Sequence, residues 1–330
     1  MSAQLIDRFN RKIDYVRISV TDRCNFRCIY CMSEHMTFLP RAQLLTLEEL
    51  ALVGQAFVEL GVTKIRLTGG EPLVRNQVLK LFQSLGKLPD LKELLLTTNG
   101  TQLTKMAQPL RAAGVKRINI SLDTLKPQRF EKISRVGKLE AVLKGIDAAI
   151  QAQFERIKLN AVVLKQRNHD EVTDLVNFAI DRGIDISFIE EMPLGHIGEH
   201  DRTEVFYSSE DIRRDLSASM TLIPTTETTG GPSRYYQVAN THTRVGFISP
   251  HSHSFCDSCN RVRVTTEGLL LLCLGQEHSV DLRRLIRAHP GTLEPLKHAI
   301  VQAMAMKPKG HDFTLAQPAS ILRYMNVTGG

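Results

Sequence analysis

The sequence predicts an α/β protein, an incomplete barrel of six β/α units over residues 1–200 followed by a smaller α+β part over residues 201–330. Apolar and β-branched runs of strand length alternate with stretches of helical length up to about residue 190. Such alternation is typical of right-handed βαβ crossovers and a parallel sheet. The alternation is lost between Asp201 and Arg244, and a chain of 330 residues is long enough for one large domain with an appendage.

Six strands are predicted, and nearly all of them are followed by a helix. The expected strands cover residues 16–20, 64–68, 93–97, 117–121, 156–163 and 185–190. The first helix begins at Thr46-Leu-Glu-Glu49, a capping box in which hydroxyl and carboxylate groups bind free backbone amides, and it ends at Gly61. The later helices are expected to end near residue 86 and to cover residues 106–113, 139–152 and 170–182.

Polar residues follow several of these strands. In parallel α/β folds the active site lies at the carboxyl ends of the strands, so we expect the loops there to line a cavity. Gly69-Gly70 leaves a backbone that a ligand can approach closely, and Glu71-Pro72 stiffens the exit. The other such loops are Thr97-Thr-Asn-Gly100, Ser121-Leu-Asp123 and Glu190-Glu-Met192.

Three of the six cysteines follow the first strand, as Cys24-x3-Cys28-x2-Cys31. Three thiolates on one short loop can hold three corners of an iron–sulfur cluster, because thiolate is the soft ligand that such iron prefers. By analogy with catalytic zinc sites, a missing fourth ligand leaves one iron open to a substrate. The alternatives are a zinc knuckle, a redox dithiol or chance clustering.

The other three cysteines lie in the C-terminal part, as Cys256-Asp-Ser-Cys259 and then Cys273 after thirteen intervening residues. Residues 261–265 and 269–273 predict a β-hairpin that returns Cys273 toward Cys259. Again three thiols are present and no fourth cysteine is left. The alternative is a structural zinc site completed by His251, His253 or His278.

Composition restricts the class of partner. A net charge of +7 indicates an anionic ligand, and nucleic acid is the rival to a small phosphorylated molecule. The basic residues are spread along the chain, aromatic residues make up 6% and Trp is absent, which leaves little for base stacking. We therefore expect no nucleic-acid partner.

The predicted localisation rests on the lack of a signal peptide or a membrane-spanning segment in the sequence. Residues 1–10 are polar, and no apolar run of about 18 residues exists, so we expect neither a signal peptide nor a membrane partner. The sequence predicts a cytoplasmic protein, where clustered cysteines more often bind metal than form disulfides.

The cysteine loop, with Tyr30 before its last cysteine, and Gly69-Gly-Glu-Pro72 one βα unit later resemble the two signatures of the radical S-adenosylmethionine (SAM) superfamily. The block Cys256-Asp-Ser-Cys-Asn-Arg-Val-Arg263, with Cys273, narrows the resemblance to the GTP 3′,8-cyclase family, molybdenum cofactor biosynthesis protein A. The resemblance covers essentially the whole chain. It implies a partial (β/α)6 radical SAM barrel with two [4Fe–4S] clusters on opposite sides.

The resemblance also implies roles for residues. Cys24, Cys28 and Cys31 would hold the cluster that binds SAM, and Cys256, Cys259 and Cys273 would hold a second cluster whose open iron meets the guanine base. Positions that match SAM contacts are Tyr30, Gly70, Ser121 and Met192. Positions that match GTP contacts are Arg17, Arg66, Thr97, Lys158, Arg261, Val262 and Arg263. The catalytic positions are Arg17, Arg261, Arg263 and the tail Gly329-Gly330, which in the family enters the active site.

Two of these assignments also rest on the residues themselves. Arg261 and Arg263 are two apart on a predicted strand, so both side chains point to the same face, beside a cysteine of the second set. Guanidinium groups bind phosphate oxygens bidentately, and a nucleoside triphosphate carries roughly four negative charges. The chain has no P-loop G-x4-G-K-[ST], so GTP would not be bound as in ordinary GTPases.

The implied reaction is the first step of molybdenum cofactor (molybdopterin) biosynthesis. A reduced cluster passes one electron to SAM, and the resulting 5′-deoxyadenosyl radical removes hydrogen from C3′ of GTP. The ribose then joins C8 to give 3′,8-cyclo-7,8-dihydro-GTP. The implied partners are GTP, an unidentified one-electron donor, cyclic pyranopterin monophosphate synthase as the functionally coupled enzyme, and a second copy in a homodimer.

Two other functions are alternatives to this reaction. The first is another radical SAM enzyme with an auxiliary cluster, such as a peptide-modifying one, but those usually carry more than three C-terminal cysteines. The second is a basic, zinc-binding nucleic-acid module without catalysis. Iron content separates the second from an enzyme, since two four-iron clusters amount to roughly eight irons per chain.

Overall fold

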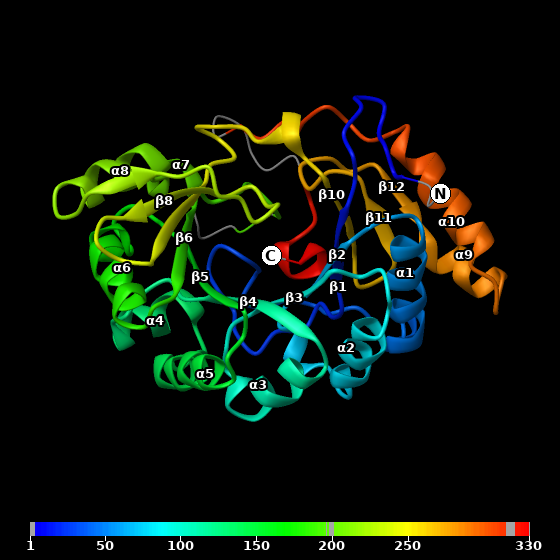
Figure 1. The fold of residues 1–330 in the computed structure, drawn as a ribbon, viewed down its shortest axis with the longest axis horizontal. Helices are drawn as coiled ribbons and strands as arrows, with labels where there is room; N and C mark the ends of the chain where they lie inside the picture. Colours follow the sequence, from blue (N-terminus) through cyan, green and yellow to red (C-terminus); the bar gives the residue numbers. More distant parts are fainter. Residues whose placement is uncertain (1–3, 196, 198–200, 315–320, 330) are drawn as a thin grey trace.

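One twelve-stranded sheet curves around the interior of the computed structural model, which describes residues 4–195, 197, 201–314 and 321–329. The strands lie in the order β12-β11-β10-β1-β2-β3-β4-β5-β6-β9-β8-β7 (Figure 1). Their bounds are β1 (Tyr15–Ser19), β2 (Lys64–Thr68), β3 (Glu93–Thr98), β4 (Val115–Ser121), β5 (Arg156–Val162), β6 (Asp185–Ile189), β7 (Leu222–Pro224), β8 (Arg234–Val238), β9 (Arg244–Ile248), β10 (Arg261–Val264), β11 (Leu269–Leu271) and β12 (Ser279–Asp281).

The six predicted strands are confirmed as β1 to β6, which lie side by side in chain order and run parallel. The structure adds a parallel strand on each side, β10 beside β1 and β9 beside β6. We predicted residues 261–265 as a strand but not its pairing with β1, and we did not predict β9, because neither strand is part of a β/α alternation. The predicted hairpin is confirmed, since β10 and β11 pair antiparallel.

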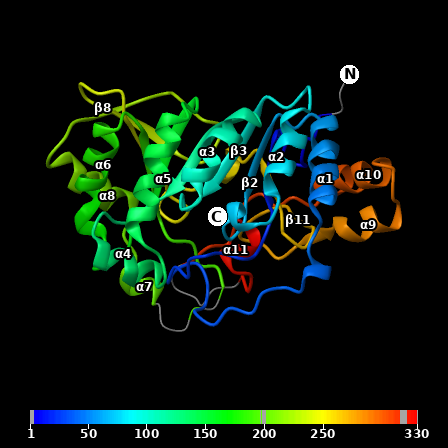
Figure 2. The same ribbon diagram turned by 90° about the horizontal axis from the view of Figure 1, so that it is seen from below.

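Helices cover the outer face of this curved sheet (Figures 1 and 2). Thr46 caps α1 through the predicted capping box with Glu49, and its apolar stripe includes Leu50, Val53 and Phe57. The α-helices are α1 (Leu47–Glu59), α2 (Val78–Gly86), α3 (Leu103–Ala112), α4 (Pro127–Ser134), α5 (Leu139–Gln151), α6 (Val172–Asp181), α7 (Arg202–Val205), α8 (Ser209–Ser217), α9 (Leu282–Ala288), α10 (Glu294–Met304) and α11 (Met325–Thr328). Short 3-10 turns are η1 (Arg41–Gln43), η2 (Pro72–Val74), η3 (His169–Glu171) and η4 (Cys256–Ser258).

The apolar core lies between the sheet and the outer helices. Phe57 of α1 and Phe82 of α2 are fully buried there, as are Ile65 and Leu67 of β2. Each such side chain contributes about 1.5–3 kcal/mol through removal from water. Alternation along β2 turns Arg66, between Ile65 and Leu67, to the opposite face. The inner face of the barrel is therefore free to carry polar groups.

The end of the chain lies inside the barrel. Helix α11 lies at the centre of the curved sheet (Figure 1), where Asn326 donates a hydrogen bond to the backbone oxygen of Asp22 at 2.7 Å. Asn326 is almost completely buried.

The division of the chain at residue 200 stays a prediction. Across it the sheet is continuous, because β9 and β10 join the edges of the β1–β6 unit. Within the described ranges, no helix combines the length and the apolar character that a membrane span needs.

Candidate active site

A cavity inside the barrel collects the predicted site residues. Its lining includes all six cysteines, which are unpaired, so both three-cysteine sites face the same space. Every predicted SAM-contact and GTP-contact residue lines this cavity as well. Val262 contributes differently from its neighbours, because its side chain is buried in the apolar core and only its backbone is left to face a ligand.

The N-terminal three-cysteine site (Cys24, Cys28 and Cys31) forms the loop directly after β1. The Phe26 amide donates to Cys24 Sγ at 3.3 Å, and the Cys31 amide donates to the Cys28 oxygen at 3.0 Å. Burial raises the pKa of the Cys24 thiol to about 11 and of the Cys31 thiol to about 12. Burial, with Cys31 next in effect, also raises the pKa of Cys28. Three soft donors that influence one another across a short loop fit an iron–sulfur cluster.

The two glycines after β2 hold this loop in place. The Gly70 amide donates to the Thr21 oxygen at 2.8 Å. A Cβ on Gly69 would lie 2.5 Å from the Thr21 oxygen, and one on Gly70 would lie 2.5 Å from the Arg23 oxygen. We expected these glycines to make room for a ligand, but the space that a side chain would need is occupied by the backbone before Cys24. Gly70 still lines the cavity.

Glu71 ties the same segment to the end of β3. Its carboxylate accepts hydrogen bonds from the amides of Leu73 and Asn99, at 3.0 and 2.6 Å, and from the hydroxyl of Thr98 at 2.8 Å. The side chain is completely buried, and burial raises its pKa to about 7. Asn99 in turn approaches Cys24 Sγ at 3.9 Å. The polar loops after β2 and β3 thus support the cysteine loop.

Asp123, after β4, holds Tyr30 over the other side of the loop. The Tyr30 hydroxyl donates to Asp123 at 2.7 Å, and the Val162 amide donates to the other carboxylate oxygen at 2.9 Å. Burial raises the pKa of Asp123 to about 6, and burial also raises the pKa of Tyr30 well above its ordinary value. Asp123 therefore positions a residue that we predicted to contact SAM.

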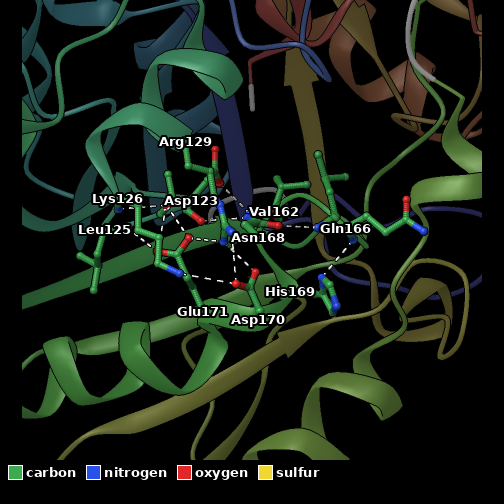
Figure 3. Close-up of polar contacts among 12 residues, drawn as sticks. Asp123, Leu125, Lys126, Arg129, Val162, Gln166, Asn168, His169, Asp170 and Glu171 are labelled. Carbon is green, nitrogen blue, oxygen red and sulfur yellow. Dashed lines mark hydrogen bonds and ion pairs between the residues drawn. The ribbon is translucent and has the colours of Figure 1, made fainter.

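Figure 3 shows how the loops after β4 and β5 are joined around Asp123. The side-chain amide of Asn168 donates to the backbone oxygens of Asp123 and Val162, both at 2.8 Å. Glu171 accepts from the amide of Leu125 at 2.9 Å and also pairs with Arg129. These contacts hold the loop that carries Asp123 against the segment after β5.

The C-terminal three-cysteine site (Cys256, Cys259 and Cys273) lies against β10 and β11. Burial raises the pKa of the Cys256 thiol, but hydrogen bonds from His311 and Ser254 outweigh burial and bring it to about 7. Burial also opposes ionisation of Cys259, yet Arg261 and Lys307 lower its pKa overall. The Cys273 pKa is raised by burial. Two thiols that ionise readily beside a third fit a metal cluster, because the thiolate is the ligand form.

His311 is a site residue that the sequence did not reveal. It lines the cavity and packs on Phe313, with ring centroids 4.5 Å apart. Its Nδ1 accepts a hydrogen bond from the Phe313 amide at 3.3 Å, and its buried Nε2 has no hydrogen-bond partner among the described residues. A lone histidine without a motif gives no sequence signal. The alternative zinc ligands, His251, His253 and His278, are not among the described residues that line the cavity.

A row of arginines crosses the inner face of the sheet. In the strand register, Arg17 of β1 lies between Arg263 of β10 and Arg66 of β2. Burial lowers the pKa of Arg17 well below its ordinary value, and the charge of Arg263 is the next cause. Burial and the charge of Arg261 lower the pKa of Arg263 to about 10. Such crowding of cations is unfavourable in an empty protein and favourable around a polyanion.

Two tyrosines that we did not predict hold predicted GTP contacts. The Tyr15 hydroxyl accepts from Arg66 Nε at 2.7 Å, and Arg66 also donates to the Leu96 oxygen at 2.7 Å. Lys158 donates to the Tyr235 hydroxyl at 3.1 Å. Burial raises the pKa of both tyrosines, but the neighbouring cations outweigh burial and lower each pKa to about 8. Tyr15 could be found only from the strand alternation that puts it on the same face as Arg17.

The tail reaches the arginine row. Gly329 has a φ of +78°, which suits glycine, and its oxygen accepts a hydrogen bond from Arg263. A Cβ on Gly329 would overlap the Thr68 side chain. Gly330, the other predicted tail residue, lies outside the described residues.

Among the described residues, no three His, Cys, Asp or Glu side chains gather at the spacing of a single-ion site.

Comparisons with known proteins agree with this arrangement. Residues 18–179 match the family model of the radical SAM superfamily, and residues 184–313 match the model named Molybdenum Cofactor Synthesis C. The chain is 60% identical over 329 residues to a GTP 3′,8-cyclase of Saccharophagus degradans, covering 100% of this chain and 99% of the relative. It is 58% identical over 327 residues to a GTP 3′,8-cyclase of Pseudomonas syringae, covering 99% and 98%.

Solved structures at low sequence identity support the fold of this chain but not its activity. The crystal structure of Streptococcus suis SuiB bound to S-adenosylmethionine superposes with a TM-score of 0.61 at 14% identity, covering 88% of this chain and 69% of that one. A second structure of SuiB gives a TM-score of 0.63 at 13% identity, with the same coverage. The likeness therefore supports an incomplete radical SAM barrel.

Proposed function

The chain belongs to the GTP 3′,8-cyclase family of radical SAM enzymes, which acts in molybdenum cofactor synthesis, and on this premise we propose that it joins C3′ to C8 of GTP in the barrel cavity. The product would be 3′,8-cyclo-7,8-dihydro-GTP. The row of arginines supports the substrate most strongly, because three guanidinium groups lie at one register level and guanidinium groups bind phosphate oxygens bidentately.

We propose that the cofactors are SAM and two [4Fe–4S] clusters, one at each three-cysteine site. When bound, SAM and the N-terminal cluster supply one-electron chemistry that can remove hydrogen from C3′. The C-terminal cluster would offer its open iron to the guanine base. The fit rests on the donor set, since each site brings three thiols to the same cavity and leaves one cluster corner without a cysteine.

The residues themselves bind and orient the substrate. Arg17, Arg66 and Arg263 would hold the triphosphate at one end of the cavity, with Lys158 on the opposite strand wall. The purine would then lie near the C-terminal three-cysteine site, beside Arg261. Orientation matters more here than acid–base catalysis, because a carbon radical attacks whichever C–H bond is closest.

The tail would complete this site. Gly329 touches Arg263 and Thr68 in the middle of the barrel, where no side chain fits. We propose that Gly329 and Gly330 fix the arginine against the substrate and exclude water. Deletion of residues 329–330 tests this role: cyclisation should be lost while the iron content stays at the level of the full chain. Loss of iron together with activity would contradict a role confined to the substrate.

The substrate itself is tested by incubating the reduced enzyme with SAM, with and without GTP. We expect 5′-deoxyadenosine and a new guanine-derived product only when GTP is present. Equal formation of 5′-deoxyadenosine without GTP would argue against GTP as the substrate. The electron donor, coupling to cyclic pyranopterin monophosphate synthase, a homodimer and a cytoplasmic location remain proposals of the same kind.

A further inference from the structure

Lys307 is a completely buried lysine in the segment after α10. It is 1% exposed and is among the largest fully buried side chains of the described residues. Lysine is almost never fully buried unless its ammonium group is paired, because removing an isolated charge from water is costly. The surroundings of Lys307 Nζ should therefore explain why the charge is tolerated there.

Three acceptors surround the ammonium group. Nζ donates to the backbone oxygen of Leu272 at 2.5 Å, to the backbone oxygen of Arg261 at 2.9 Å and to Cys259 Sγ at 3.8 Å. An ammonium group has three hydrogens to donate, so this set uses all of them. Arg261 follows Cys259 by two residues, and Leu272 directly precedes Cys273. One side chain therefore holds both strands of the hairpin that carries these two cysteines.

The counter-charge of Lys307 is sulfur. Among the described residues, no carboxylate lies within ion-pair distance of its Nζ. The carboxylate whose charge acts on Lys307, Asp7, is already engaged with Arg11 at 2.6 Å. Neutral thiols would leave the ammonium group uncompensated, whereas thiolates bound to a metal cluster supply the missing negative charge.

We propose that Lys307 is a positioning residue that sets both the geometry and the reduction potential of the cluster at the C-terminal three-cysteine site. This inference rests on the proposed function, in that it requires a cluster there. A cation and a hydrogen bond at a ligand sulfur stabilise the reduced cluster, which carries one more negative charge, and so raise the reduction potential. At the N-terminal site the donors to sulfur are neutral, the Asn99 side chain and the Phe26 amide at Cys24, and the carboxylates of Glu71 and Asp123 raise the pKa of the thiols.

Arg11 provides a matched comparison. Its guanidinium donates to the backbone oxygens of Cys256 and Lys309, both at 2.7 Å, and of Pro308 at 2.6 Å. It anchors the same region as Lys307 but makes its hydrogen bonds to carbonyl groups and to Asp7, with none to sulfur among the described residues. Its charge also lowers the pKa of Cys259, but it is a smaller cause than Lys307. Loss of Arg11 therefore loosens the cysteine loop without removing a donor from a ligand.

The experiment uses the full chain with Cys24, Cys28 and Cys31 replaced by Ala, so that only the C-terminal cluster remains. Its midpoint potential is measured by a redox titration followed by electron paramagnetic resonance. For Lys307→Met we expect the ratio of reduced to oxidised cluster at a fixed potential to fall about tenfold, which equals about 59 mV for one electron. Lys307→Arg should stay close to the parent, and Arg11→Met should lower iron content with a clearly smaller shift of potential than Lys307→Met, because Arg11 donates no hydrogen bond to the sulfur.

Four outcomes separate the explanations. A lower potential in Lys307→Met with recovery in Lys307→Arg supports the proposal. Loss of the cluster in Lys307→Met but not in Lys307→Arg supports it as well. An unchanged potential in Lys307→Met, or the same shift in Arg11→Met, overturns it. If the parent with Lys307 intact binds no iron, the two-cluster part of the proposed function fails, and the inference fails with it.

Discussion

The two three-cysteine sites use the same ligands in opposite electrostatic surroundings. At the N-terminal site all three thiols have raised pKa values, mainly through burial, and Glu71 and Asp123 lie close by. At the C-terminal site burial acts in the same direction, but neighbouring cations and hydrogen bonds lower the pKa of Cys256 and Cys259. Charge, not ligand type, distinguishes the two sites.

This difference matches different tasks. A cluster next to carboxylates has a lower reduction potential, which makes it the stronger reductant and suits it to pass an electron to SAM. The proposed cluster among Arg261, Lys307 and His311 would have a higher potential and would favour an anionic ligand. One cavity can therefore combine a site that delivers an electron with a site that holds the nucleotide. The predictions below test this contrast.

The largest expected effects come from removing one ligand at each site. Cys28→Ala should abolish both SAM cleavage and cyclisation, since in the proposed function the N-terminal cluster would be the electron source. Cys259→Ala should abolish cyclisation but leave SAM cleavage by a chemical reductant. Quantifying 5′-deoxyadenosine and the guanine product in both variants checks this. Loss of SAM cleavage in both would mean that the two sites do not have separate tasks.

Gly70→Ala should act on the N-terminal site alone. The new Cβ would lie 2.5 Å from the Arg23 oxygen and 2.9 Å from the Asp22 oxygen, so the cysteine loop must move. We expect about half of the iron to be lost, which corresponds to one cluster of two. Spectroscopy of the remaining iron in the variant should show the C-terminal cluster. A variant with full iron content and normal SAM cleavage would contradict this role of the glycine.

Arg66→Lys should weaken GTP binding without changing iron content. Lysine cannot keep both the hydrogen bond to Tyr15 and the one to the Leu96 oxygen while facing a phosphate. We expect KM for GTP to rise about 10- to 100-fold, the usual effect of losing a hydrogen bond to a charged group. Tyr15→Phe is the control and should have a smaller effect in the same direction. An unchanged KM for Arg66→Lys would remove Arg66 from the substrate site.

The smallest effect concerns the thiols in cluster-free protein whose fold has been checked by circular dichroism. The Cys256 pKa of about 7 means that about half of this thiol is ionised at pH 7, whereas Cys24, with a pKa of about 11, is almost entirely protonated. Alkylation of Cys256 should therefore rise with pH through 7 and level off above 8. Cys24 should react slowly throughout this range. Equal rates at pH 7 would contradict the electrostatic contrast.

Much of the fold follows from local patterns in the sequence. Strands β1 to β6, the capping box of α1 and the β10–β11 hairpin all depend on residues close to one another in the chain, so their periodicity and turn residues reveal them. The pairing of β10 with β1 joins residues almost 250 positions apart and leaves no local pattern. Helix α4 was not predicted either. It is an extra helix between β4 and α5, so it is not part of the regular β/α alternation.

The site divides in the same way. Cysteines at fixed spacing and two arginines on one strand face are visible as motifs. The supporting residues are single side chains that become meaningful only through distant partners: Tyr15 beside Arg66, Tyr235 beside Lys158, and His311 beside Cys256. Lys307 is the clearest case. A lysine is expected to be exposed to solvent, but the fold buries this one beside two strands.

The central claim is that a radical formed at the N-terminal site acts on a GTP held toward the C-terminal site in the same cavity. The most direct measurement incubates the reduced enzyme with SAM and GTP deuterated at C3′ and follows the label by mass spectrometry. The account predicts deuterium in 5′-deoxyadenosine together with formation of the cyclised product. Unlabelled 5′-deoxyadenosine alongside the cyclised product would contradict it.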